Sequence, residues 1–137
     1  MGLSEAEKNI DIVRRSMELW NSGDLGALVA TFTDDAELQP APGFVEGEVL
    51  LGHEGIRHFF ERLHEAWKPG DTVTLGEVRE AGDKVMFSFR WRAIGGVSGI
   101  ETTSEWMAVD TFRDGLIARM QIFSDRGEAL EAMGISG

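Results

Sequence analysis

One acidic residue occupies a position where a carboxyl group could work away from water. Asp110 lies in the segment IETTSEWMAVDTF (100–112), whose alternating apolar and polar residues predict a strand. On a strand Asp110 shares one face with Trp106, Ala108 and Phe112, which are all apolar. Burial there would raise the pKa of the carboxyl group and make it a usable acid or hydrogen-bond donor. The alternative is that Asp110 lies near the strand end, wetted by solvent and without a chemical role.

Two further carboxylates, Asp34 and Asp35, are adjacent in TFTDDAELQPAPG (31–43). Short acidic side chains readily accept hydrogen bonds from nearby backbone N–H groups in turns. We therefore predict that they mark the turn between a helix and a strand and are not catalytic.

The three histidines do not form a metal-ligating pattern. His53, His58 and His64 are separated by five and six residues, which does not bring them to one face of a helix. We predict no metal site, and His58 should lie on a polar, solvated face.

The predicted secondary structure that must position these residues is helical in the first half of the chain. Ser4 and Glu7 have the spacing of a capping box before an amphipathic helix, and Asp24 can cap a shorter second helix. A third helix should begin near His53 and end at Pro69–Gly70.

From Asp71 onward the apolar period changes from that of a helix to that of a strand. Short glycine-containing turns separate the predicted strands, so they should pair as an antiparallel meander. A brief helix from Asp125 to Gly134 should follow. The predicted strands are 72–78, 84–93, 100–112 and 116–124.

Composition narrows the classes of partner. The 137 residues suit one domain, 1–137, and the net charge of −11 disfavours nucleic acid and anionic lipid. There is no cysteine, and no apolar run approaches the roughly 20 residues that span a bilayer. We expect a cytoplasmic protein that needs no membrane and no cofactor.

Three segments carry a family resemblance: ELWNSGDLGALVATFTDDAEL (18–38), GHEGIRHFFERL (52–63) and FRDGLIARMQIFSDRGEAL (112–130). Together they resemble the SnoaL-like group of the nuclear-transport-factor-2-like superfamily, over nearly the whole chain. The resemblance implies an α+β cone of three or four helices packed on a strongly curved antiparallel sheet. It also implies a cavity between helices and sheet, and a homodimer through the outer sheet face. Members include polyketide cyclases, steroid isomerases, dehydratases, epoxide hydrolases and binding modules.

Residues that the resembling enzymes require are missing here, which argues against some of the family's activities. Ketosteroid isomerases keep their general base at about the position of Pro40 and use a tyrosine in the oxyanion hole, but this chain has no tyrosine. The epoxide-hydrolase set also requires tyrosine, and Ile122 stands near the position of its last carboxylate. Asp110 falls close to the second, buried acid of the isomerases, so it is the main catalytic candidate.

His53 and a set of apolar residues complete the candidate site. His53 could border the cavity mouth and assist Asp110, although it could equally be only a helix-start residue beside Glu54. The tryptophans fall on inward-facing positions, where they could be core or could line a pocket for a flat apolar ligand. The candidate ligand-binding residues are Trp20, Phe60, Phe89, Trp91, Trp106, Met120 and Ile122.

The opposite face of the strands should be the outer surface. Arg90 and Arg92 lie there across from Glu101 and Glu105, as expected for cross-strand ion pairs. The alternative is a bulge that exchanges the inner and outer faces of the strand, which would turn the arginines into the cavity toward an anionic substrate. Four apolar residues on this face would be uncovered and would favour a dimer. They are Met107, Val109, Ile117 and Phe123.

Two hypotheses of different class follow. In the first, the protein binds a small apolar molecule, cyclic or carbonyl-bearing, and acts on it as a cofactor-independent isomerase, cyclase or dehydratase through Asp110 and His53. In the second, it is a non-catalytic dimeric ligand-binding module of the same fold.

Overall fold

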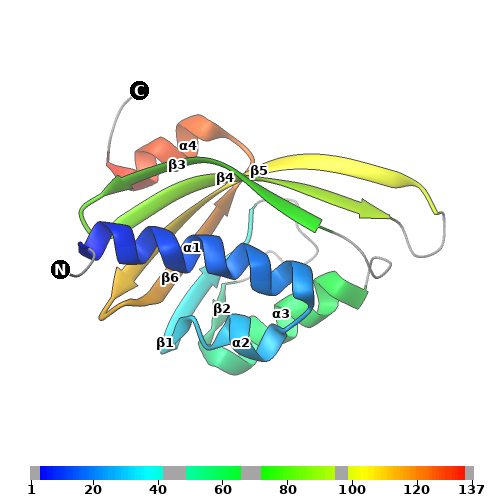
Figure 1. Ribbon diagram of the computed structural model, residues 1–137, viewed down its shortest axis with the longest axis horizontal. Coiled ribbons are helices and arrows are strands. Elements are labelled where there is room, and N and C mark those ends of the chain that lie inside the picture. Colours follow the sequence, from blue (N-terminus) through cyan, green and yellow to red (C-terminus); the bar gives the residue numbers. More distant parts are fainter. Residues whose placement is uncertain (1–3, 42–48, 66–71, 95–98, 135–137) are drawn as a thin grey trace.

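Four helices and a six-stranded sheet make up the computed structural model, which describes residues 4–41, 49–65, 72–94 and 99–134. The predicted helix end at Pro69–Gly70 lies outside the described residues. Helices α1, α2 and α3 lie on one side of the curved sheet and α4 on the other (Figure 1). The helices are α1 (Glu5–Ser22), α2 (Leu25–Val29), α3 (Gly52–Glu65) and α4 (Arg126–Met133). The strands are β1 (Phe32–Gln39), β2 (Leu50–Leu51), β3 (Thr72–Ala81), β4 (Lys84–Ile94), β5 (Glu101–Arg113) and β6 (Leu116–Phe123).

The helix ends follow the predicted capping chemistry. The side chain of Ser4 accepts a hydrogen bond from the backbone N–H of Glu7, and Asp24 accepts one from Ala27. Asp125 caps α4 in the same way, and Gly134 ends it in the left-handed conformation that glycine adopts without strain. These local signals explain why the predicted helices were placed correctly.

The sheet is mixed, not wholly antiparallel as the sequence predicted. Its strand order is β2-β1-β6-β5-β4-β3, and β1 pairs with β6 in parallel. Short turns enforce antiparallel pairing only between consecutive strands, so the meander prediction holds for β3 to β6 alone. β1 and β6 are far apart in the chain, so no short connection between them fixes their relative direction.

The prediction of a turn at Asp34 and Asp35 was wrong. Both residues lie within β1 and are exposed to solvent. Asp35 forms an ion pair with Arg113 (2.5 Å) and accepts a hydrogen bond from the Thr33 hydroxyl (2.9 Å). The Arg113 guanidinium, together with Thr33, holds the pKa of Asp35 below its ordinary value.

A bulge in β6 changes which of its residues face inward. Thr111 pairs with Arg119 but Phe112 pairs with Ile117, so Ala118 is an extra residue on β6. Ile117 is therefore buried, with 1% of its surface exposed, whereas Leu116 is 37% exposed. The sequence analysis placed Ile117 on the outer face because a strict two-residue period ignores a bulge.

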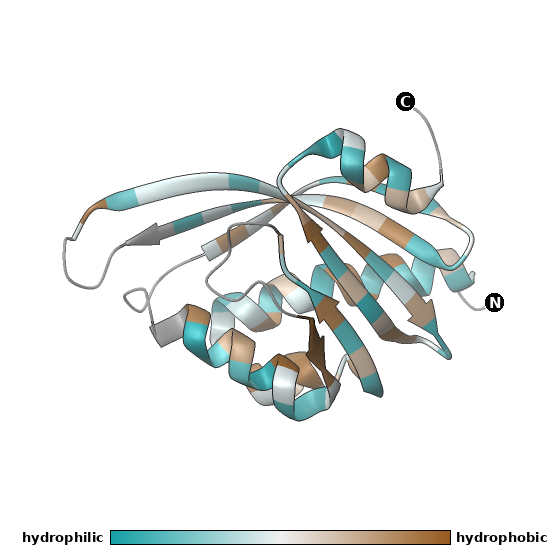
Figure 2. Cartoon of the chain, turned by 180° about the vertical axis from the view of Figure 1, so that it is seen from behind, coloured by the Kyte–Doolittle hydropathy of each residue, from teal (hydrophilic) through white to brown (hydrophobic). Residues whose placement is uncertain are grey.

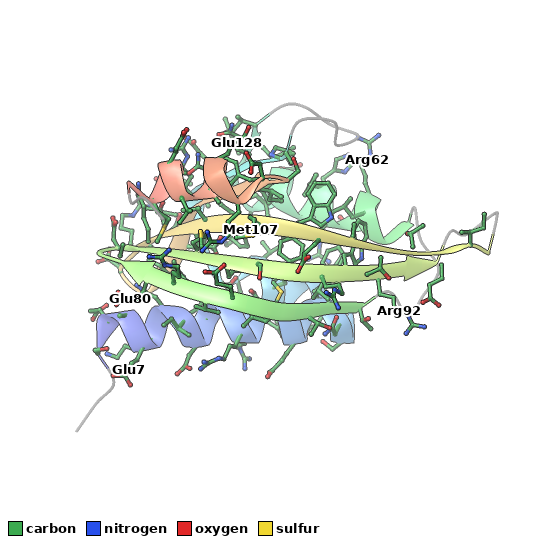
Figure 3. All side chains as sticks on the ribbon, turned by 90° about the horizontal axis from the view of Figure 1, so that it is seen from above. Glu7, Arg62, Glu80, Arg92, Met107 and Glu128 are labelled. Carbon is green, nitrogen blue, oxygen red and sulfur yellow. The ribbon has the colours of Figure 1, made fainter. Side chains whose placement is uncertain are left out.

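The outer face of the sheet is covered in part by α4. Met107 and Val109 pack against Leu130 and Met133 of α4 in an apolar cluster, and Figure 3 shows Met107 beneath α4. The prediction that this face lies uncovered was therefore wrong for Met107 and Val109, as it was for Ile117. The apolar argument for a dimer is correspondingly weaker.

Farther along the strands the outer face is polar. Arg92 pairs with Glu101 at 2.8 Å, and Arg90 lies 4.0 Å from Glu105, which confirms the predicted cross-strand ion pairs. The strands show alternating hydrophilic and hydrophobic bands along their length (Figure 2). In the part of the chain that the structure describes, no helix combines the length and the apolar character needed to cross a membrane.

Candidate functional site

A pocket lies between the helices and the concave face of the sheet. It encloses about 660 Å³ of space free of atoms, including the solvent at its mouth. Helices α1, α2 and α3 supply one wall and strands β1, β3, β4, β5 and β6 the other. The lining residues are Ser16, Met17, Trp20, Leu28, Phe32, Phe59, Phe60, Leu63, Val73, Phe89, Trp91, Trp106, Asp110, Ile117, Met120 and Ile122.

Aromatic side chains form much of the pocket wall. Trp20 contacts Phe60 edge-to-face with ring centroids 5.7 Å apart, and it contacts Trp91 in the same way at 6.4 Å. The indole N–H of Trp106 donates to the hydroxyl of Ser104 at 2.8 Å. All seven residues predicted to bind a ligand line this pocket. Their contact with a ligand stays a prediction.

Asp110 is the one residue with an ionisable side chain among the described lining residues. Only 1% of its surface is exposed, and its Oδ1 atom has no hydrogen-bond partner. Burial without a compensating charge raises the pKa of this carboxyl group well above its ordinary value. The group is therefore held in its neutral, protonated form over a wider pH range than an exposed aspartate.

The sequence predicted the orientation of Asp110 correctly and left its burial open. The residue lies in the interior of β5, paired with Val85 on β4 and Met120 on β6. It is three residues from the end of β5, but only 1% of its surface is exposed, so the solvated alternative was wrong.

His53 is at the start of α3, as predicted, but is not one of the lining residues. Its Nε2 atom lies 2.8 Å from the backbone carbonyl oxygen of Phe32, to which it donates, and 3.8 Å from Asp34. The ring therefore ties α3 to β1. The structure does not bring His53 into the pocket with Asp110, and a catalytic role for it stays a prediction.

Two buried polar residues on α1 escaped the sequence analysis. Ser16 lines the pocket, but its hydroxyl donates to the backbone carbonyl of Val13 at 2.7 Å. Asn9 is buried with its Oδ1 atom unpaired, though it is not among the lining residues. The buried residues of α1 are Asn9, Val13, Ser16 and Trp20, a helical spacing that we could have read from the sequence by allowing polar members.

No metal centre is evident in the described ranges, which contain no cluster of three His, Asp or Glu side chains that could hold an ion. The lining residues that the structure describes likewise include no set of charged groups for a phosphate-bearing cofactor. The chemistry available at this site is that of one carboxylic acid in an apolar, aromatic environment.

Fold and site together define a class: α+β proteins with a curved sheet that encloses an apolar pocket against three helices. The family model described as the SnoaL-like domain matches residues 13–120. The chain belongs to this family, as the sequence resemblance indicated. No curated protein matches the sequence.

Solved structures share the fold at low sequence identity. Bal32a, from a soil-derived mobile gene cassette, is 26% identical with a TM-score of 0.77, covering 87% of this chain and 90% of that one. TerC, co-crystallised with polyporic acid, is 23% identical with a TM-score of 0.76, covering 92% and 97%. SalBIII, an epoxide hydrolase/cyclase-like enzyme of pyran ring formation in the polyether salinomycin, is 23% identical with a TM-score of 0.73, covering 85% and 90%.

The burial of Asp110 predicts how stability depends on pH. Below the ordinary carboxyl pKa of 3.8, both the folded and the unfolded chain hold the proton. Above it, the unfolded chain releases the proton while the folded chain keeps it, so ΔG of unfolding falls as pH rises toward the folded-state pKa. The slope from this group is about 1.4 kcal/mol per pH unit in that window.

Asp110→Asn removes the titration and nearly preserves the shape. We expect its free energy of unfolding, relative to wild type, to rise from acid toward neutral pH. Urea denaturation of both proteins across this range measures the difference. A difference that stays constant with pH would contradict the buried, protonated state.

Proposed function

We propose that this protein binds a small, largely apolar molecule, cyclic or carbonyl-bearing, in the pocket around Asp110. The observation that carries the proposal is the combination of an aromatic wall with a single buried carboxyl group that has an unpaired oxygen. Apolar area supplies affinity, and one polar group fixes the orientation of the ligand.

The charge of the protein narrows the ligand further. The described lining residues include no lysine, arginine or histidine, and the chain has a net charge of −11. A carboxylate or phosphate ligand would lose its hydration in this pocket without gaining an opposite charge. Neutral molecules therefore fit best.

Asp110 can act on a bound carbonyl group in a defined way. A protonated carboxyl donates a hydrogen bond to the carbonyl oxygen, and this bond strengthens as negative charge develops on that oxygen during enolisation. The α-proton passes to solvent at the pocket mouth, because no other described lining residue is a base. This is the chemistry shared by isomerase, cyclase and dehydratase reactions without a cofactor. The alternative is a non-catalytic ligand-binding module, in which the same hydrogen bond serves only recognition.

The relatives are consistent with ligands of this type. A structure with the same fold, 18% identical and with a TM-score of 0.73, is that of a putative polyketide cyclase from Xanthomonas campestris. SalBIII acts in ring formation, and TerC was crystallised with polyporic acid. These names support an apolar or cyclic ligand and leave open whether this chain is an enzyme.

Binding can be tested with a matched pair of bicyclic probes. α-Tetralone carries a carbonyl group, and tetralin is the corresponding hydrocarbon. We expect wild type to bind α-tetralone more tightly than tetralin. Asp110→Leu should reduce the affinity for α-tetralone by roughly tenfold, the effect of one lost hydrogen bond. Isothermal titration calorimetry measures both affinities. Failure of wild type to bind either probe would contradict the proposal.

Catalysis is tested separately, by exchange of the α-protons of α-tetralone in D₂O followed by NMR. If Asp110 assists enolisation, wild type accelerates the exchange and Asp110→Asn loses about 100-fold of that acceleration. His53→Ala should then reduce the rate only if the histidine takes part. Exchange at the uncatalysed rate, with the ketone bound, would leave the binding module as the function.

The homodimer through the outer sheet face also remains a prediction. Arg119 is exposed there and lies 3.9 Å from Glu37. Arg119→Glu reverses its charge beside that carboxylate and should weaken self-association through this face. Analytical ultracentrifugation measures the effect, with Arg14→Glu on the exposed side of α1 as a control of equal charge change. An unchanged dimer in Arg119→Glu would place the interface elsewhere.

A further inference from the structure

The unpaired oxygen of Asp110 limits which ligand group can meet it. A neutral carboxyl group has one O–H donor and a carbonyl oxygen that accepts. Asp110 lines the pocket, and its Oδ1 atom is buried without a donor. A ligand that only accepts a hydrogen bond, such as a simple ketone, satisfies the O–H and leaves the accepting oxygen unpaired.

None of the described residues donates a hydrogen bond to Oδ1 of Asp110, so the missing donor is left to the ligand. The Ser16 hydroxyl is already directed to the Val13 carbonyl, and the Trp106 indole N–H to Ser104. Asp110 is almost fully buried, whereas Trp91 and Trp106 are half-buried. Trp106 and Asp110 are four residues apart on β5, roughly 13 Å along a strand. Trp91 and Trp106 therefore lie at the more open end of the pocket, and Asp110 lies at its closed end.

We propose that the ligand carries an adjacent hydrogen-bond donor and acceptor, as in a lactam or an enolised β-dicarbonyl, on a flat ring system. Such a group pairs with the carboxyl of Asp110 through two parallel hydrogen bonds, one in each direction. The ring remains against the aromatic side chains nearer the mouth. This inference rests on the proposed function, because it concerns the same pocket, and it goes further by naming the recognised group.

Two bicyclic probes of nearly identical shape isolate the donor. Carbostyril presents N–H beside C=O, and coumarin has a ring oxygen in place of the N–H. We expect wild type to prefer carbostyril by roughly tenfold, the value of one additional hydrogen bond to a buried acceptor. Isothermal titration calorimetry measures both dissociation constants under the same conditions.

Two substitutions at Asp110 assign the preference to this residue. The amide of Asp110→Asn also offers an N–H donor beside a carbonyl acceptor, so carbostyril should still be preferred. The Leu side chain of Asp110→Leu offers neither, and the two probes should bind it equally. If Asp110→Leu does not fold, N-methylcarbostyril with wild type serves instead, because methylation blocks the donor and should reduce binding to the level of coumarin.

The outcomes separate this inference from the proposed function. Binding of neither probe nor of α-tetralone would overturn both. Equal binding of carbostyril and coumarin to wild type would overturn the inference alone and leave a pocket that recognises only a carbonyl. A preference for carbostyril that persists in Asp110→Leu would also overturn the inference, because another group would then accept the hydrogen bond from the N–H of carbostyril.

Discussion

The burial of one carboxyl group in an apolar pocket is the constraint on which the site depends. Desolvation disfavours the charged form of Asp110, and no cation or donor in its described surroundings compensates its Oδ1 atom. An unsatisfied buried polar group destabilises a fold by about 1–3 kcal/mol. The rest of the domain must tolerate that loss, and the apolar contacts on both faces of β5 are where it can be offset.

Strand β5 is positioned so that Asp110 is almost fully buried and lines the pocket. It pairs with β4 on one side and β6 on the other. Its inward residues face α1 and α3 across the pocket, while Met107 and Val109 on the outward side are covered by α4. The small C-terminal helix therefore contributes to the site without touching it, because it excludes water from the back of the strand that carries the acid.

The sequence predicted those parts of the fold that depend on local rules. Helix caps at Ser4 and Asp125 and the alternation along β4 and β5 gave the right helices and the right inward faces, including that of Asp110. The prediction failed where distant parts of the chain decide the outcome. The parallel pairing of β1 and the cover of α4 over Met107 are tertiary effects, and the bulge at Ala118 breaks the two-residue period on which the facing of Ile117 was predicted. For the same reason the sequence could give the direction of Asp110 but not its burial.

A single carboxyl group in an aromatic pocket also explains how such a site can be selective. Apolar contacts discriminate weakly between ligands of similar shape, whereas a buried polar group left unpaired by the wrong ligand is strongly unfavourable. Ligand affinity can therefore come from the aromatic wall, and ligand choice from Asp110 alone. Most of the described lining residues are apolar, so replacing the carboxyl group at the closed end would change which ligand is bound. In the empty protein the unpaired oxygen of Asp110 is unfavourable. A ligand that supplies the missing hydrogen-bond partner removes this unfavourable energy, whereas a ligand without that partner does not. The buried acid therefore makes the pocket specific.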